Sequence, residues 1–200
     1  DLITVKPSSK PLEEVDNEID FAAMTPMQAF YAMQSSKGFR QLHTIKKLII
    51  GGGPVDQTLL SHIRKLDTEV WHTYGMAETL THVALKKLNG NKPDDHFKAL
   101  PGVRFNKDDR GCLVIHAPWL SDKEINTNDL VNLMDETSFD FTGRFDNLIN
   151  SGGIKISPES VESKLQKYLE ARFIITGLPD EVLGQKTVLV IEGENQSPEK

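Results

Sequence analysis

The sequence predicts an α/β protein that continues into an antiparallel, strand-rich region and ends in a small α+β unit. The order strand, helix, strand over residues 47–74 predicts a parallel sheet, because the helix returns the chain to the edge where the next strand begins. Short alternating segments separated by turns follow after residue 80 and are typical of antiparallel strands. From residue 147 a hairpin, a helix and two more strands are predicted.

The first part of the chain carries weaker signals. Residues 1–20 are rich in Lys, Pro and Glu and lack periodicity, which predicts a loop or a short strand. A core-facing helix is predicted from Phe21 to Ser35, because a set of residues follows helical spacing. These residues are Met24, Met27, Phe30, Tyr31 and Gln34.

The α/β region begins with a buried strand, Lys47–Ile50, which runs into the glycine turn 51–53. Pro54 is predicted as the first residue of the next helix, where its missing N–H leaves no hydrogen bond unmade and its φ is already helical. The next strand is predicted over residues 69–74. The apolar face of the intervening helix comprises Leu59, Leu60, Ile63 and Leu66.

The remaining elements are shorter. In the last region a helix is predicted from Ser157, a suitable N-cap followed by Pro158, to about Glu170. Further strands are expected at residues 173–176 and 187–191. The strands of the middle region are predicted at residues 81–88, 102–105, 112–116, 129–134 and 139–141.

Composition and charge exclude several classes of protein. The chain of 200 residues is 38% hydrophobic and 26% charged, which is typical of a globular protein with a sizeable core. A net charge of −6 argues against a nucleic-acid partner, since phosphate binding needs a basic surface. No apolar run is long enough for an integral membrane segment. The single cysteine, Cys112, excludes an internal disulfide and suits a cytoplasmic location, and no pattern predicts an oligomeric state.

Two motifs of the α/β region could contact a ligand. The turn Gly51-Gly52-Gly53 follows an apolar strand, so its amides could approach a polar ligand, although a plain strand-to-helix turn is the alternative. The segment from Tyr74 to Thr79 lies at the carboxyl end of the next strand, where parallel sheets bind ligands. There Tyr74 could stack on a base, and Glu78 could supply an oxygen to Mg²⁺. A polar loop with one buried tyrosine is the alternative.

A second group of candidates follows the middle strands. Asp129 could accept two hydrogen bonds from a ribose diol, or it could be a turn aspartate. Arg144 could hold phosphate or ribose oxygens with its planar guanidinium group. Asp146 lies two residues further on and could simply pair with Arg144. With the flexible turn Ser151-Gly152-Gly153 behind them, these residues indicate a nucleotide-handling enzyme with a moving lid.

In this order the motifs resemble those of the acyl-adenylate-forming superfamily, which comprises acyl-CoA synthetases, firefly luciferase and peptide-synthetase adenylation domains. The segment 74–78 resembles the family's Tyr-Gly-x-Thr-Glu, which implies that Tyr74 lies on adenine and Glu78 binds Mg²⁺. Residues 127–129 resemble its Thr-Gly-Asp, which implies that Asp129 binds the ribose hydroxyls. Residues 143–146 resemble its Gly-Arg-x-Asp, which implies that Arg144 lies near the nucleotide and that Asp146 is a hinge.

The resemblance covers almost the whole chain and assigns three sets of residues. The catalytic set is Glu78, Arg144 and the hinge residue Asp146. The nucleotide-binding set is Gly51, Gly52, Gly53, Tyr74, Gly75, Ala77, Asp129 and Arg144. The set that resembles the loop of the thiol step is Ser151, Gly152, Gly153 and Lys155.

The resemblance also implies a division of the chain. Residues 1–145 are expected to be the C-terminal part of a large AMP-binding domain, with an α/β part over 1–80 and an antiparallel, β-barrel-like part over 81–145. Residue 146 is expected to be the hinge. Residues 147–200 are expected to be the first part of a small α+β lid domain.

The activity implied is that of an AMP-forming acyl-CoA ligase, with ATP/AMP and Mg²⁺ as cofactors, coenzyme A as co-substrate and a small carboxylic acid as substrate. Residues 21–28 and 147–155 are similar to the o-succinylbenzoate–CoA ligase branch of menaquinone biosynthesis. Two alternatives remain open. One is a ligase for a fatty or aryl acid, and the other is a non-catalytic nucleotide-binding module.

Departures from the family pattern lead to further expectations. Ala77 replaces a threonine that usually contacts the α-phosphate, and backbone amides or Thr79 could offset the missing hydroxyl. Asn128 replaces a glycine, and Asn150 replaces a common lysine. The family's upstream phosphate loop is not in the sequence, and Lys200 does not match its C-terminal catalytic lysine. These absences predict a fragment that is inactive alone.

Overall fold

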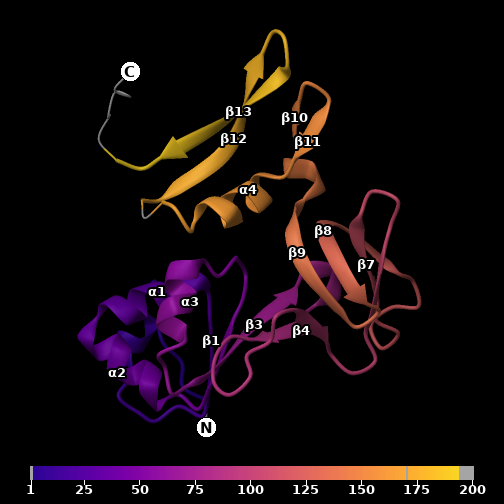
Figure 1. Cartoon of the computed structure of the whole chain (residues 1–200). Coiled ribbons are helices and arrows are strands. Elements are labelled where there is room, and N and C mark those ends of the chain that lie inside the picture. The colour runs from indigo at the N-terminus through magenta and orange to yellow at the C-terminus, as the bar shows by residue number, and fades with distance from the viewer. Residues whose placement is uncertain (1, 170, 194–200) are drawn as a thin grey trace. The chain divides into compact units, whose positions relative to one another are not determined.

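The structure, a computed structural model, describes residues 2–169 and 171–193, so Glu170 and Lys200 lie outside it (Figure 1). The chain forms two compact units. The first contains the chain up to Arg104 together with His116–Ile125, and the second contains Phe105–Ile115 and the chain from Asn126 onward. Within the described ranges, no helix combines the length and the apolar character needed to span a bilayer.

The first unit is built on a mixed sheet with the strand order β1-β2-β3-β4-β5. Its first three strands are parallel, and β4 and β5 each run antiparallel to the preceding strand. The mixed α/β fold that the sequence predicts is therefore confirmed. The strands are β1 (Phe21–Met24), β2 (Lys47–Ile50), β3 (Glu69–Gly75), β4 (His82–Lys87) and β5 (Phe97–Ala99).

The helices of the first unit share one apolar core with the sheet. Ala29, Leu42 and Ile63 come from three different helices and are fully buried against Leu48 and Val70 of the strands. Removing this much apolar surface from water is the main favourable contribution to folding of the unit. The helices are α1 (Pro26–Gln34), α2 (Ser36–Thr44) and α3 (Gln57–Ile63), with a 3₁₀ turn, η1, at Pro11–Glu14.

The single helix predicted from Phe21 to Ser35 is wrong at its beginning. Its first four residues form β1, which pairs with β2, and the helix starts only at Pro26. Thr25 sets this boundary, because its Oγ1 accepts a hydrogen bond from the Gln28 amide and the Gln28 side chain accepts one from the Thr25 amide. Ser35 then caps α2, which the sequence analysis missed.

Two other predictions in this unit need correction. Pro54 does not begin a helix, since α3 starts at Gln57. Asp56 is its N-cap, and the Asp56 carboxylate accepts a hydrogen bond of 2.7 Å from the Leu59 amide. Leu66 lies beyond the end of α3 but is still buried. β5 was not predicted, because three residues are too few to show alternation.

The strands of the second unit lie in two groups of neighbours, β9-β8-β7-β6 and β11-β10-β13-β12. Several extend further than predicted, because register shifts in the β8–β9 pair let the ladder continue past local irregularities. The β-barrel-like subdomain and the lid domain stay predictions. The strands are β6 (Arg104–Lys107), β7 (Cys112–His116), β8 (Ile125–Asp135), β9 (Ser138–Arg144), β10 (Ile149–Ser151), β11 (Ile154–Ile156), β12 (Phe173–Asp180) and β13 (Gly184–Ile191).

The helix of this unit, α4 (Pro158–Leu165), is shorter than predicted. Ser157 is its N-cap, as predicted, and its Oγ accepts a hydrogen bond from the Ser160 amide. Glu162 of α4 accepts a hydrogen bond of 2.7 Å from the Ile175 amide and so joins the helix to β12. Short 3₁₀ turns occur at η2 (Ala77–Thr79) and η3 (Phe145–Asn147).

The Asn89 side chain forms hydrogen bonds to the backbone around the turn between α3 and β3. Its side chain is buried, its Oδ1 accepts a hydrogen bond from the Val70 amide, and its Nδ2 lies within 3.2 Å of three carbonyl oxygens. Those carbonyls belong to Ile63, Leu66 and Thr68, at the end of α3 and in the turn that follows. One amide group thus hydrogen-bonds to backbone groups at the end of α3, in the turn that follows and at the start of β3.

We expect Asn89→Leu to lower the free energy of unfolding by about 3 kcal/mol or more, because several buried backbone groups lose their partner at about 1–3 kcal/mol each. Urea unfolding followed by circular dichroism measures the change. Asn91→Ala, at an exposed position two residues away, is the control and should change stability by less than about 0.5 kcal/mol. Equal stability of the two variants would contradict the role given to Asn89.

Candidate functional site

A cavity of about 560 Å³ lies in the first unit, at the carboxyl ends of β1, β2 and β3. Four of the predicted nucleotide-binding residues, Gly51, Gly52, Gly75 and Ala77, are among its lining. The carboxyl edge of parallel strands is where open α/β sheets bind ligands, because the loops that leave this edge diverge. The cavity therefore lies at the edge of the sheet where the sequence predicts a ligand site, and ligand binding there stays a prediction.

The other residues predicted in this region are not among the described residues that line the cavity. The Gly53 carbonyl accepts a hydrogen bond from His72, the Tyr74 ring lies 5.9 Å from that of Phe97, and Glu78 is exposed on η2. Their roles toward adenine and Mg²⁺ stay predictions.

The cavity also has polar lining that the sequence analysis missed. No Lys, Arg, Asp or Glu is among the described lining residues, so a ligand there meets neutral hydrogen-bonding groups and one imidazole. These groups come from three separate parts of the chain, and therefore no local motif joins them. They are Thr25, Gln28, Thr73, Thr81 and His82.

The loop after β3 is shaped by the buried hydroxyl of Thr79. Thr79 Oγ1 accepts a hydrogen bond from the Met76 amide and lies 2.7 Å from the Thr81 carbonyl, to which it can donate. The side chain is completely buried. Thr79 therefore does not offset the hydroxyl that Ala77 lacks, which corrects one expectation from the sequence.

Gly75 is required by the path of this loop. A Cβ at this position would lie 2.5 Å from the Thr81 carbonyl oxygen and 2.6 Å from the Cα of His82, and both are backbone atoms. The close approach allows the chain to turn back from β3 into β4. Gly75 is thus explained by folding, and its contact with a nucleotide stays a prediction.

The His72 side chain contacts the backbone of the glycine turn 51–53. Its Nε2 lies 3.0 Å from the Gly53 carbonyl, and its ring packs 5.0 Å from that of Phe97. Burial lowers the pKa of His72 from its ordinary value of 6.5 and outweighs the opposing effect of the Gly53 hydrogen bond. The neutral imidazole with a proton on Nε2 fits this contact, because a carbonyl oxygen needs a donor.

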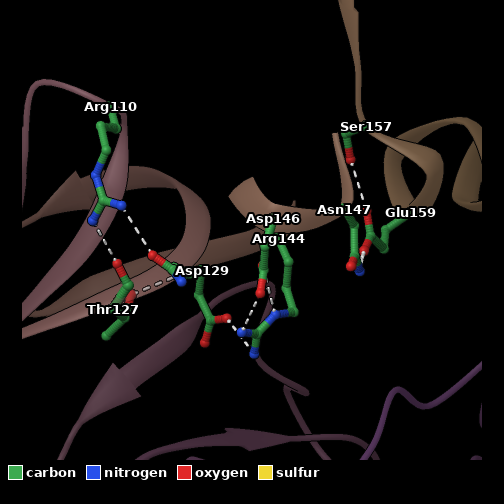
Figure 2. Close-up of polar contacts among 9 residues, drawn as sticks. Arg110, Thr127, Asp129, Arg144, Asp146, Asn147, Ser157 and Glu159 are labelled. Carbon is green, nitrogen blue, oxygen red and sulfur yellow. Dashed lines mark hydrogen bonds and ion pairs between the residues drawn. The ribbon is translucent and has the colours of Figure 1, made fainter. Parts of the chain in front are cut away.

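The second unit brings together Asp129, Arg144 and Asp146, which the sequence proposed as one group. Asp129 and Arg144 are register partners on β8 and β9, and Arg144 Nη1 lies 3.4 Å from Asp129 Oδ1. Arg144 also donates two hydrogen bonds of 3.0 Å to the Asp146 carboxylate. Figure 2 shows the guanidinium group between the two carboxylates. The ion pair between Arg144 and Asp146, one of the two possibilities from the sequence, is present. Asp129 forms a second ion pair with the same arginine.

The two carboxylates lie in different surroundings. Only 7% of Asp129 is exposed, and its amide donates a hydrogen bond to Thr127 Oγ1 within β8. Asp146 is exposed, and the hydrogen bonds from Arg144 lower its pKa more than desolvation raises it. A buried carboxylate that faces an arginine is a suitable acceptor for a sugar diol.

Behind Arg144, the start of α4 packs tightly against β9. Ser157 Oγ donates to the Thr142 carbonyl, and Glu159 accepts a hydrogen bond of 2.6 Å from the Asn147 side chain (Figure 2). Gly143, with φ of +144°, leaves room for both, because a Cβ there would meet Ser157 Oγ and lie 2.6 Å from Glu159 Oε2. Close packing of α4 against β9 therefore explains the glycine at position 143.

The predicted loop of the thiol step is the hairpin between β10 and β11, which contains Ser151, Gly152, Gly153 and Lys155. The Gly152 amide donates a hydrogen bond of 2.9 Å to the Leu183 carbonyl, so the hairpin is joined to the β12–β13 turn. Lys155 Nζ lies 5.2 Å from the centre of the Phe145 ring. A role in thiol transfer stays a prediction.

Comparisons with known proteins agree on one group of enzymes, although no family model matches the chain. A 2-succinylbenzoate–CoA ligase of Salmonella typhimurium is 27% identical over 207 residues, which cover 94% of this chain and 43% of that ligase. This chain therefore spans less than half the length of that relative.

Solved structures give the same result. An AMP-forming acyl-CoA synthetase/AMP-acid ligase II-like protein from Dyadobacter fermentans is 38% identical with a TM-score of 0.66, over 98% of this chain and 57% of that one. E. coli MenE, solved with an m-phenylether-linked analogue of OSB-AMS, is 20% identical with a TM-score of 0.72, over 90% of this chain and 43% of that one. At this identity the MenE match shows a shared fold.

Gly143→Ala tests the packing behind Arg144. We expect it to lower the free energy of unfolding by about 1–3 kcal/mol, because alanine is strained at this φ and displaces Ser157 and Glu159. Thermal and urea unfolding measure the effect. Gly193→Ala, where a Cβ would have no atom within 4 Å, is the control. Unchanged stability of Gly143→Ala would show that the close packing is not required.

The lowered pKa of His72 predicts a pH dependence of stability. Above about pH 6.5 the imidazole is neutral in the folded and unfolded states, and its contribution is fully present. Below that pH the unfolded state takes up a proton that the folded state resists, so the free energy of unfolding falls by at most about 1.4 kcal/mol per pH unit.

Urea unfolding of wild type and His72→Gln between pH 7.5 and 5 measures this effect. Glutamine keeps a donor and does not titrate, so the variant should lose less stability than wild type on acidification. Parallel pH profiles would remove His72 as the cause.

Proposed function

We propose that this chain, which belongs to the acyl-adenylate-forming superfamily, is part of an AMP-forming acid–thiol ligase and holds the nucleotide of that reaction. The observation that carries the proposal is the arrangement of Asp129 and Arg144 on neighbouring strands. A nucleotide has a diol and phosphates close together. The buried carboxylate binds the diol, and the arginine binds the phosphate or ribose oxygens.

The proposed reaction has two steps. A carboxylate oxygen of the acid attacks the α-phosphorus of ATP, the bond to the β-phosphate oxygen breaks, and pyrophosphate leaves. The coenzyme A thiolate then attacks the acyl carbon of the mixed anhydride, and AMP leaves with the pair of electrons from the broken C–O bond. Holding the reactants in place lowers the entropic part of both barriers.

The described residues can hold Mg²⁺ only if the ion is bound together with the nucleotide. The described residues contain no group of three or more His, Cys, Asp or Glu side chains that could form a metal cage. A Mg²⁺ ion that arrives on the nucleotide needs only one or two carboxylates, because phosphate oxygens and water supply the other ligands. Glu78 is exposed on η2 and is the residue we assign to this ion. When bound, Mg²⁺ offsets charge on the phosphates.

The hinge and the thiol-step loop belong to the same proposal. Asp146 lies in η3, directly after β9, and the β10–β11 hairpin follows it in the chain. Rotation at Asp146 would carry Gly152, Gly153 and Lys155 together, since the hairpin and the β12–β13 turn are hydrogen-bonded. This hydrogen bond supports joint movement of the hairpin and the β12–β13 turn, and the rotation would also break the contacts of Ser157 and Glu159 with β9.

For the acid substrate we propose o-succinylbenzoate, on the similarity to 2-succinylbenzoate–CoA ligases. The cavity is lined by both apolar and neutral hydrogen-bonding groups, which is compatible with an aromatic acid that carries hydrogen-bonding groups. We also propose that these 200 residues bind the adenylate but release little pyrophosphate, because Ala77 lacks the hydroxyl and Thr79 does not replace it.

Titration calorimetry on the chain tests the proposal. We expect AMP to bind, and Asp129→Asn to weaken binding about tenfold, because one strong acceptor for the diol is lost. A non-hydrolysable o-succinylbenzoyl adenylate analogue should bind more tightly than AMP and than the fatty-acyl or benzoyl analogues.

Three results would contradict parts of this proposal. Failure of AMP to bind refutes the nucleotide site, and equal binding of all acyl analogues refutes the choice of acid. Rapid pyrophosphate release on addition of ATP and o-succinylbenzoate refutes the inactivity of the chain. Asp16→Asn, at an exposed position in the first unit, is the matched control and should leave AMP binding unchanged.

A further inference from the structure

Arg110 is an unassigned residue whose side chain joins the elements of the candidate site in the second unit. Its Nη2 donates a hydrogen bond of 2.9 Å to the Thr127 carbonyl, and its Nη1 donates one of 2.9 Å to Asn128 Oδ1. Figure 2 shows the guanidinium group of Arg110 directed at the residues of β8 that precede Asp129. Arg110 therefore contacts the two residues that come before the proposed ribose ligand.

The guanidinium group is itself held from its other side. Arg110 Nε donates a hydrogen bond of 2.8 Å to Asp108 Oδ2, and Asp108 Oδ1 accepts hydrogen bonds from the Arg110 and Cys112 amides. The turn between β6 and β7 thus fixes the arginine where it reaches the β8 residues before Asp129. Only a planar group with several donors can make these contacts at once, so lysine is not an equivalent.

Arg110 also contacts the segment that contains the proposed hinge. Its guanidinium carbon lies 5.2 Å from the centre of the Phe145 ring, a distance typical of a cation–π contact. Phe145 lies between Arg144 and Asp146 in sequence. One side chain therefore orders both polypeptide segments that supply the Asp129–Arg144–Asp146 group.

We propose that Arg110 is a positioning residue of the nucleotide site, acting through Asp129, an inference that rests on the proposed function. Arg110 holds the backbone of Thr127 and the side chain of Asn128, which fixes where the Asp129 carboxylate lies. It does so without a contact to the nucleotide. Its loss reduces the preference for a ribose with both hydroxyls, because that preference depends on the position of Asp129.

The test compares AMP with 2′-deoxy-AMP by titration calorimetry for wild type, Arg110→Gln and Arg110→Lys. We expect Arg110→Gln to weaken AMP binding about tenfold and 2′-deoxy-AMP binding by less than about twofold, so that discrimination between them falls. Arg110→Lys should give an intermediate value. Arg40→Gln, at an exposed arginine of α2, is the matched control and should keep the wild-type ratio.

An equal loss of affinity for both nucleotides would overturn the inference, since general damage to the fold affects both alike. Wild-type affinity of Arg110→Gln for both AMP and 2′-deoxy-AMP would also overturn the inference.

If wild type binds neither nucleotide, the proposed function fails, and hydrogen exchange decides the positioning role separately. Exchange of the amides of residues 126–130 should then be about tenfold faster in Arg110→Gln than in wild type. Unchanged exchange would refute the positioning role.

Discussion

The antiparallel register of β8 and β9 is the constraint on which the candidate site depends. It places Asp129 opposite Arg144, and a slip of one residue would turn one of the two side chains to the other face of the pair. The other contacts of the site are added to this pair. Asp146 reaches Arg144 because it comes two residues after the end of β9, and Arg110 reaches the β8 residues before Asp129 from the turn between β6 and β7.

The ion pairs of Arg144 with Asp129 and Asp146 contribute little to the stability of the fold, which leaves these groups available for a ligand. Arg144 is about half exposed and is shared between two carboxylates, so each pair contributes little to the free energy of folding. Asp129 is buried and needs a cation or donors nearby, because an isolated buried carboxylate is costly. A site of this kind can take new hydrogen-bonding partners without loss of the fold.

Several residues of the recognised motifs serve the fold first. Gly75 allows two backbone segments to approach, Thr79 closes the loop after β3 with a buried hydroxyl, and Gly143 makes room for the start of α4. Such residues look like ligand contacts in a sequence, because turns at strand ends are also where ligands bind. The structure separates the two roles, since a buried hydroxyl with backbone partners does not reach a ligand.

The sequence by itself determined the α/β class, most strands, the N-cap at Ser157 and the group Asp129, Arg144 and Asp146. These features depend on local patterns, on turn chemistry or on motifs of a few residues, and they can be read without knowledge of distant partners. The hydrogen bonds that begin α1 at Thr25 are local as well. The strand Phe21–Met24, in contrast, has residues at helical spacing, and only its pairing with β2 specifies it as a strand.

Only the tertiary structure decided the cavity lining, the buried amide of Asn89 and the link from Arg110 to the β8 residues before Asp129. Thr25 is far from Thr73 and His82 in the sequence and lies near them only because the strand order β1-β2-β3-β4 brings these strand ends together. Arg110 and Thr127 are 17 residues apart and meet through a side chain–backbone hydrogen bond between the β6–β7 turn and β8. Contacts of this range depend on register and packing, which no local pattern of residues specifies.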